Sequence, residues 1–147
     1  MGKLQFNIDL DVGRAQRRLA AVELRSKNLA PIFLYAQQRL RVANAENFAV
    51  GGLPAADGPW KPRKDTGSYT HPLMIRSGTL MNSLTSLFGP PNIIMPTYAE
   101  FGTNVEYAKF HQYGTTKMPA RKVVFEPRGF GRDLAERTAS YIANGIF

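Results

Sequence analysis

Few side chains in this chain could do acid–base or metal chemistry, and they are far apart. The chain has two histidines, His71 and His111, and no cysteine, so a zinc site would need both histidines plus carboxylates from separate segments. Glu100 and Glu106 are the acidic pair closest to the histidine-bearing run, but a glycosidase needs two carboxylates that face a cleft, and the sequence defines none. We therefore predict no catalytic residue, no metal and no cofactor, and give His111 a structural hydrogen-bonding role.

The run of residues 101–125 is dense in glycine, aromatic and polar side chains. It predicts a turn, a short helix, a stop at Gly114 and a β-branched strand over 121–125, because glycine commonly ends helices and valine favours strands. Its aromatic side chains could stack on nucleic-acid bases or fill a core with the tyrosines at its edge. We favour a core, and we place Tyr107 and Tyr113 at an interface because tyrosine combines apolar area with a polar tip.

Composition indicates one domain, 1–147, with a modest core. The net charge of +8 favours acidic partners or nucleic acid. The basic residues are dispersed and no nucleic-acid-binding motif accompanies them, so a charged protein surface is preferred and a basic nucleic-acid-binding accessory protein is the alternative. No apolar run approaches the roughly 18 residues of a membrane span, and the N-terminus lacks the apolar core of a signal peptide. We expect no membrane partner and assembly in the cytoplasm.

Hydrophobic periodicity predicts the elements that position these side chains. Residues 4–10 alternate between apolar and polar, as in a half-buried strand. Asp11 stands at a helix N-cap position, and apolar residues then recur every three or four positions over 12–46. This is one long amphipathic helix or two. Pro31 would remove a hydrogen bond at a cost of about 3 kcal/mol, but the apolar period continues through it in phase, so we favour one helix kinked at Pro31.

Residues 49–76 are crowded with glycine and proline and predict a long extended loop arm. Loops of this length are uncommon unless they are functional or disordered. Trp60, the only tryptophan, lies within it. Its large side chain either pins the loop to its own domain or inserts into a neighbouring subunit, and pinning is the preferred reading.

The remaining patterns predict a segregated arrangement of helices and strands. They indicate a helix over 74–88, short strands over 92–95 and 98–101, a helix over 105–113 and a final helix over 130–142. Segregation of this kind is typical of an α+β fold. We therefore expect a long N-terminal helix packed on a small antiparallel sheet, followed by the loop arm and a C-terminal helix.

Three motifs occur in order between residues 48 and 126. They are Gly58-Pro-Trp60 followed by Lys61-Pro62, Arg76-Ser-Gly-Thr-Leu80 with Ser83-Leu84, and the run 100–115, with its Tyr-Ala and His-Gln-Tyr-Gly sequences, followed by Met118-Pro-Ala-Arg121. Together they resemble the Mu G-like phage virion-morphogenesis, or tail-completion, family, which is related to lambda Z-like minor tail proteins.

This resemblance implies a structural virion protein at the head–tail junction, a tail-completion or neck component assembled in the host cytoplasm. Such proteins build rings, and we expect a homo-oligomeric, hexameric ring. Its expected partners are connector or head-completion proteins and tail terminator or tail tube proteins, with DNA passing through the lumen without specific binding.

A ring needs two different patches on each subunit that meet head to tail. The resemblance suggests the 50–72 loop as a reaching arm and the 107–121 segment as its receiver. The candidate interface residues are Trp60, Tyr107, His111, Gln112, Tyr113 and Arg121. Arg121 could make a bidentate salt bridge across subunits. On this hypothesis, replacing Trp60 or Arg121 by alanine blocks tail joining and leaves the subunit folded.

Overall fold

The computed structural model describes residues 11–64, 67, 70–87 and 91–146. Within these ranges the elements are α1 (Val12–Ser26), α2 (Ala30–Val50), the 3-10 turn η1 (Pro54–Ala56), α3 (Thr79–Thr85), β1 (Ile93–Ile94), β2 (Ala99–Glu100), α4 (Ala108–Tyr113) and α5 (Phe130–Asn144). The helices are separate from one antiparallel hairpin, which confirms the predicted α+β class. The strand predicted over residues 4–10 lies outside the described residues.

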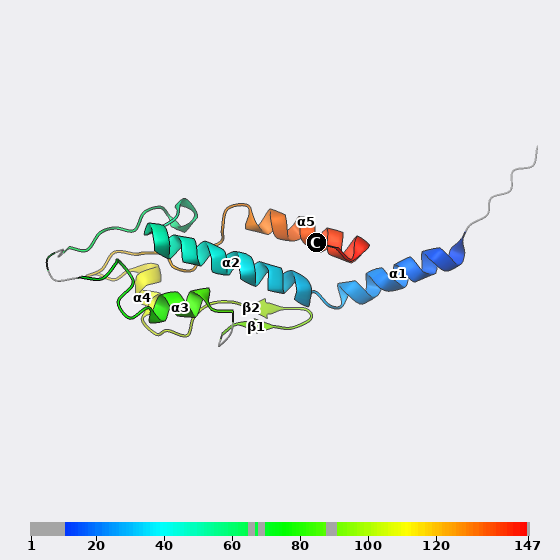
Figure 1. Cartoon of the computed structure of the whole chain (residues 1–147), viewed down its shortest axis with the longest axis horizontal. Coiled ribbons are helices and arrows are strands. Elements are labelled where there is room, and N and C mark those ends of the chain that lie inside the picture. Colours follow the sequence, from blue (N-terminus) through cyan, green and yellow to red (C-terminus); the bar gives the residue numbers. More distant parts are fainter. Residues whose placement is uncertain (1–10, 65–66, 68–69, 88–90, 147) are drawn as a thin grey trace, which may run out of the picture.

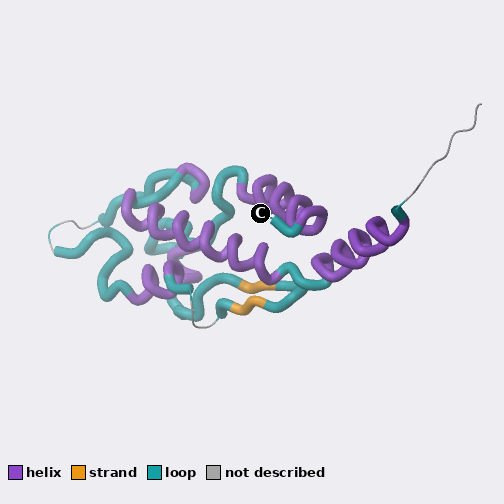
Figure 2. The backbone as a smooth tube through the Cα atoms, turned by 45° about the vertical axis from the view of Figure 1, so that its right-hand side comes forward, coloured by secondary structure: helices purple, strands orange, loops and turns teal. Residues whose placement is uncertain are grey.

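The central element is α2, which contacts α3, α5 and β1 (Figure 1). The helix α5 lies along one side of α2, while α3 and the β1–β2 hairpin lie along another. By contrast, α1 extends away from this body, as both views show (Figures 1 and 2). The C-terminal end of α1 meets the end of α5, where Arg25 Nη1 donates to the carbonyl of Ile142 at 2.7 Å.

The preferred single helix kinked at Pro31 is wrong, because the chain leaves the helix between α1 and α2. Pro31 occupies the first turn of α2, where its missing N–H breaks no hydrogen bond. In a continuous helix its ring would clash with the carbonyl of Lys27. The break has hydrogen bonds of its own: Asn28 Oδ1 accepts from Ala30 N at 3.2 Å, and Leu29 N donates to Pro96 O at 2.7 Å. The predicted Asp11 N-cap is confirmed, since its side chain accepts from Arg14 N.

The core gathers residues from segments that are distant in sequence. One cluster of buried side chains contains Phe48, Trp60, Leu80, Leu84, Ala108 and Val123. These residues come from α2, the loop, α3, α4 and the segment after α4. Trp60 is 7% exposed and lies edge-on to Phe48, with ring centroids 5.3 Å apart. The tryptophan therefore pins the loop to its own subunit, which was the preferred reading.

The two predicted short strands are present as an antiparallel hairpin. In it, Ile93 pairs with Glu100 and Ile94 with Ala99. The helix predicted over 74–88 is shorter and begins at Thr79. The strand predicted over 121–125 is wrong, because this segment joins no sheet. Its backbone is bonded instead by side chains from α2, the loop and α4. These side chains supply the hydrogen-bond partners that a neighbouring strand would supply in a sheet.

Candidate interface site

Gln112, on α4, binds the main chain of the following segment with its whole carboxamide. Its Oε1 accepts from Val123 N at 3.0 Å and from Val124 N at 2.9 Å, and its Nε2 donates to Val124 O at 2.8 Å. An amide side chain offers one acceptor group and two donors, so it can imitate a strand edge. Gln112 therefore fixes the path of 121–125 relative to α4.

The turn after α4 brings the two segments together. Gly114 has φ of 74°, and a Cβ there would lie 2.7 Å from Ala120 N. Only glycine combines this conformation with such a close approach of backbone. Arg121 N then donates to His111 O at 2.6 Å, which closes the turn. The glutamine and the glycine of the His-Gln-Tyr-Gly sequence are thus explained by local folding.

The loop is attached to the same segment through a shared carbonyl. Lys122 O accepts from Trp60 Nε1 at 3.0 Å and from Asn47 Nδ2 at 3.1 Å. Asn47 is fully buried, and its Oδ1 accepts from Leu53 N at 2.8 Å. Because buried polar groups need partners, the indole N–H and this amide jointly hold α2, the loop and the 121–125 segment.

Arg121 is a second tie between the segment and the loop. Its Nε donates to Lys61 O at 2.9 Å and its Nη2 to Pro62 O at 3.2 Å. The residue is 6% exposed. Burial lowers the pKa of the Arg121 guanidinium, and the nearby positive charge of Arg63 lowers it further. In the subunit its polar groups are therefore directed at the subunit's own loop.

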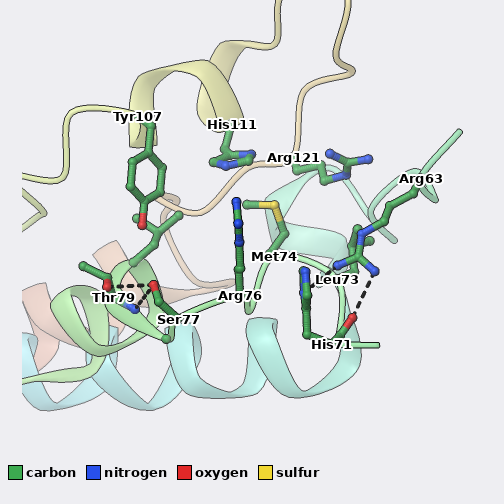
Figure 3. A pocket seen from close by; sticks show the side chains of 12 residues that line it. Arg63, His71, Leu73, Met74, Arg76, Ser77, Thr79, Tyr107, His111 and Arg121 are labelled. Atoms are coloured by element: carbon green, nitrogen blue, oxygen red, sulfur yellow. Dashed lines mark hydrogen bonds between the residues drawn. The ribbon is translucent and has the colours of Figure 1, made fainter. Parts of the chain in front are cut away.

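A cavity of about 540 Å³ opens beside these residues (Figure 3). Tyr107, at the N-cap of α4, and His111, on α4, border it. Arg121 borders it from the following segment, and Arg76 from the stretch before α3. Arg63 and His71 lie at one end, where the Arg63 guanidinium hydrogen-bonds to His71 O and Pro72 O at 2.9 and 2.8 Å. The wall therefore combines cationic groups with aromatic ones.

His111 stands edge-on to Tyr107, with ring centroids 5.9 Å apart. Burial lowers the pKa of the His111 imidazole, and the charge of Arg121 lowers it further. Its Nδ1 is buried and has no hydrogen-bond partner among the residues that the structure describes. The predicted hydrogen-bonding role is therefore not seen at Nδ1, and the described contact of the ring is its edge-on packing against Tyr107.

The structure brings together some of the predicted interface residues and separates others. Tyr107, His111 and Arg121 border the cavity. Trp60 is in the core and Gln112 binds the main chain on the other side of α4. Tyr113 is 82% exposed and lies outside this cavity wall.

Sequence reasoning did not identify the cavity residues that come from the loop. Arg63 and His71 show no periodic pattern, because an irregular loop presents side chains at irregular spacings. Arg76 stands in one of the three ordered motifs but was not singled out. The close spacing of Lys61, Arg63 and Lys64 was the one available signal of a basic loop.

The geometry gives no support for metal chemistry in the described part of the chain. Residues 11–64, 67, 70–87 and 91–146 contain no group of three histidine, cysteine, aspartate or glutamate side chains suited to a metal ion. In those same ranges no helix is long and apolar enough to cross a membrane. The fold and site thus define a small α+β protein whose most distinctive surface is a basic, aromatic-lined cavity.

Sequence comparison identifies the family to which the chain belongs. A model of the phage virion morphogenesis family matches residues 10–145. A relative from Haemophilus influenzae, "Mu-like prophage FluMu G protein 2", is 32% identical over 133 residues, covering 84% of this chain and 82% of that protein. No solved structure matches at a significant level. The chain belongs to the phage virion morphogenesis family, and its role is in building the virion.

Proposed function

We propose that this protein is a non-enzymatic ring component of the phage head–tail junction, a tail-completion or neck protein. Copies of the chain associate in a closed, hexameric ring between connector or head-completion proteins and tail terminator or tail tube proteins. DNA passes through the lumen without specific binding. Membership of a virion morphogenesis family supports a structural role.

The observation that carries the proposal is the position of α1. None of its residues is buried, and it extends away from the rest of the subunit (Figure 1). Val12, Ala15, Leu19 and Val22 follow one another at helical spacing along one side. Val12 is 59% and Leu19 69% exposed. Val22 is half-buried toward the end of α1 that meets α5, whereas Val12, Ala15 and Leu19 are exposed. A neighbouring copy would remove these three side chains from water.

A helix that packs on the next subunit gives the contact a direction. The stripe on α1 would meet a different surface of its neighbour, so the contact repeats around a ring until it closes. The receiving surface that we propose is the exposed aromatic edge of α4, Tyr107, Phe110 and Tyr113. Aromatic residues are enriched in the cores of protein interfaces. In this arrangement Trp60 and Arg121 act indirectly by holding α4 in place.

A matched pair of variants tests the ring. Leu19→Gln removes an apolar side chain from the stripe, whereas Arg18→Gln introduces the same side chain on the basic side of α1. We expect wild-type and Arg18→Gln proteins to give virions with a ring of this chain at the junction in cryo-EM reconstructions. We expect Leu19→Gln to give heads and tails that do not join. A junction that lacks this protein in wild-type virions would refute the proposal.

One observation favours a second function. Arg14, Arg17 and Arg18 lie next to one another at helical spacing on α1 and are all exposed, so they could contact phosphate. A basic nucleic-acid-binding accessory protein would bind generic duplex DNA with an affinity that falls steeply with salt. A ring component should show weak duplex binding and salt-resistant association with virion proteins. Fluorescence anisotropy with a labelled duplex, at several salt concentrations, distinguishes the two.

A further inference from the structure

We propose that the cavity beside Arg76 binds a carboxylate that stands next to an apolar side chain, on an acidic segment of a partner protein. This inference rests on the proposed assembly function in one respect only, which is that the acidic segment belongs to a partner protein. The binding chemistry follows from the cavity itself.

The cavity is lined by cationic groups. Arg63, Arg76 and Arg121 all border it, and none of the described residues that line it is acidic. Arg121 donates to two neutral carbonyls of the loop. The Arg76 guanidinium makes no hydrogen bond or ion pair with any described residue, and Figure 3 shows it extended toward His111 and Arg121. An arginine fork of this kind fits a carboxylate in a bidentate arrangement.

Another part of the wall is apolar. Leu73, Met74 and Leu80 line the same cavity as the cationic groups. Met74 has φ of 66°, a left-handed conformation that is costly for a side chain of this size. Such conformations are concentrated at ligand-binding sites, where the surrounding structure holds them. The cavity therefore presents a place for an apolar side chain immediately beside a place for an anion.

These features favour a protein segment over DNA. The volume of about 540 Å³ suits a few side chains or a small molecule. A duplex presents phosphates on a convex, polar surface and carries no apolar group on its backbone to occupy the space beside Leu73 and Leu80. A glutamate or aspartate next to a leucine or an aromatic residue supplies both components in one protruding segment.

The test uses hexanoate, which joins one carboxylate to a short apolar tail, on the full-length protein. Binding is followed by NMR shifts of the His111 ring and the Met74 methyl group, two groups at the cavity. Hexanol and inorganic phosphate are the control ligands. Hexanol has the apolar tail without the carboxylate, and phosphate has a negative charge without the tail. Arg76→Gln removes the cation without removing a hydrogen bond to any described residue, and Arg18→Gln makes the same change on the distant α1.

We expect hexanoate to shift both groups saturably and to bind more tightly than hexanol or phosphate. Arg76→Gln should weaken hexanoate binding about tenfold or more, because a hydrogen bond to a charged group contributes about 1.5–3 kcal/mol. Arg18→Gln should leave it unchanged. Unshifted His111 and Met74 signals would overturn the proposal, as would equal weakening by the two variants. Stronger binding of phosphate or of a short duplex, dependent on Arg76, would assign the cavity to nucleic acid instead.

The outcome is independent of the ring experiment. Leu19→Gln alters α1 and leaves the cavity intact, so hexanoate binding should survive in a variant that does not assemble. Failure of hexanoate binding in a protein that still forms the ring removes this inference and leaves the proposed function standing.

Discussion

Gln112 and Val124 are joined by two hydrogen bonds that together imitate one rung of a β-sheet. Gln112 Oε1 accepts from Val124 N at 2.9 Å, and Gln112 Nε2 donates to Val124 O at 2.8 Å. A side chain on α4 thus replaces a neighbouring strand. This bonding explains the glutamine in the His-Gln-Tyr-Gly sequence, which has no catalytic or metal-binding role to account for it.

Gln112→Ala should destabilise the subunit by about 2 kcal/mol, because the buried N–H of Val123 is left without its partner. Urea unfolding followed by circular dichroism measures the change. Gln16→Ala is the matched control on the exposed surface of α1 and should change the free energy of unfolding by less than about 0.5 kcal/mol. Similar values for the two variants would show that the bonds to Val123 and Val124 add nothing.

Trp60→Ala should destabilise the subunit by about 3–5 kcal/mol, since it opens a cavity in the core. From the sequence alone, the variant is expected to leave the subunit folded, whereas the burial of Trp60 predicts this loss of stability. Trp60→Phe keeps an aromatic ring against Phe48 but loses the bond to Lys122 O, which still accepts from Asn47. We therefore expect a smaller loss, about 1–2 kcal/mol. Thermal unfolding by circular dichroism ranks the variants, and equal losses would refute the separation of packing from hydrogen bonding.

Gly52→Ala should disturb the loop far more than Gly51→Ala. A Cβ at Gly52 would lie 2.5 Å from Gly58 O and 2.6 Å from Trp60 N, whereas one at Gly51 meets nothing within 4 Å. Both residues have positive φ, so both variants bear a conformational cost of about 1–2 kcal/mol. Only Gly52→Ala also forces the backbone near Trp60 to move. Its tryptophan fluorescence should shift to longer wavelength as the indole meets water, and an unshifted spectrum would contradict this contact.

The sequence predicted the elements whose signals are local. Asp11 capped α1, the 3.6-residue period located α5, and Pro96 marked the turn of the hairpin. It failed where side chains from distant segments decide the structure. Valines at 123 and 124 favour a strand. In the structure, however, the side chains of Gln112, Asn47 and Trp60 form the hydrogen bonds to this main chain that a neighbouring strand would otherwise form.

The two other differences have physical reasons of the same kind. Apolar residues recur at spacings of three and four on both sides of Pro31, although only α1 is clearly amphipathic. The spacing therefore could not reveal that the chain turns between α1 and α2. The cavity residues Arg63 and Arg76 come together through the fold of the loop, for which spacing gives no rule. Motif resemblance identified the family, while the roles of Trp60 and Arg121 needed their burial and partners.

Acidification should weaken the fold through His111. Burial and the charge of Arg121 lower the pKa of His111 below its ordinary value of 6.5. Between these two pKa values the unfolded chain binds more protons than the folded one, so stability falls as pH decreases. The penalty is absent above the unfolded pKa and grows as pH drops toward the folded pKa. Asp133 affects stability in a separate and lower pH range. Its pKa is depressed chiefly by the hydrogen bond from Tyr35, so the stability that its carboxylate contributes is lost as pH falls through that depressed pKa.

Urea unfolding between about pH 7.5 and pH 5.5 isolates the histidine, since Asp133 remains charged throughout that range. The wild-type free energy of unfolding should decrease across it. His111→Gln carries no titrating group and should show a flatter dependence, even if its stability at pH 7.5 differs. The same slope in both proteins would mean that His111 titrates alike in the folded and unfolded chains. Burial and the charge of Arg121 would then not lower the pKa of His111 in the folded protein.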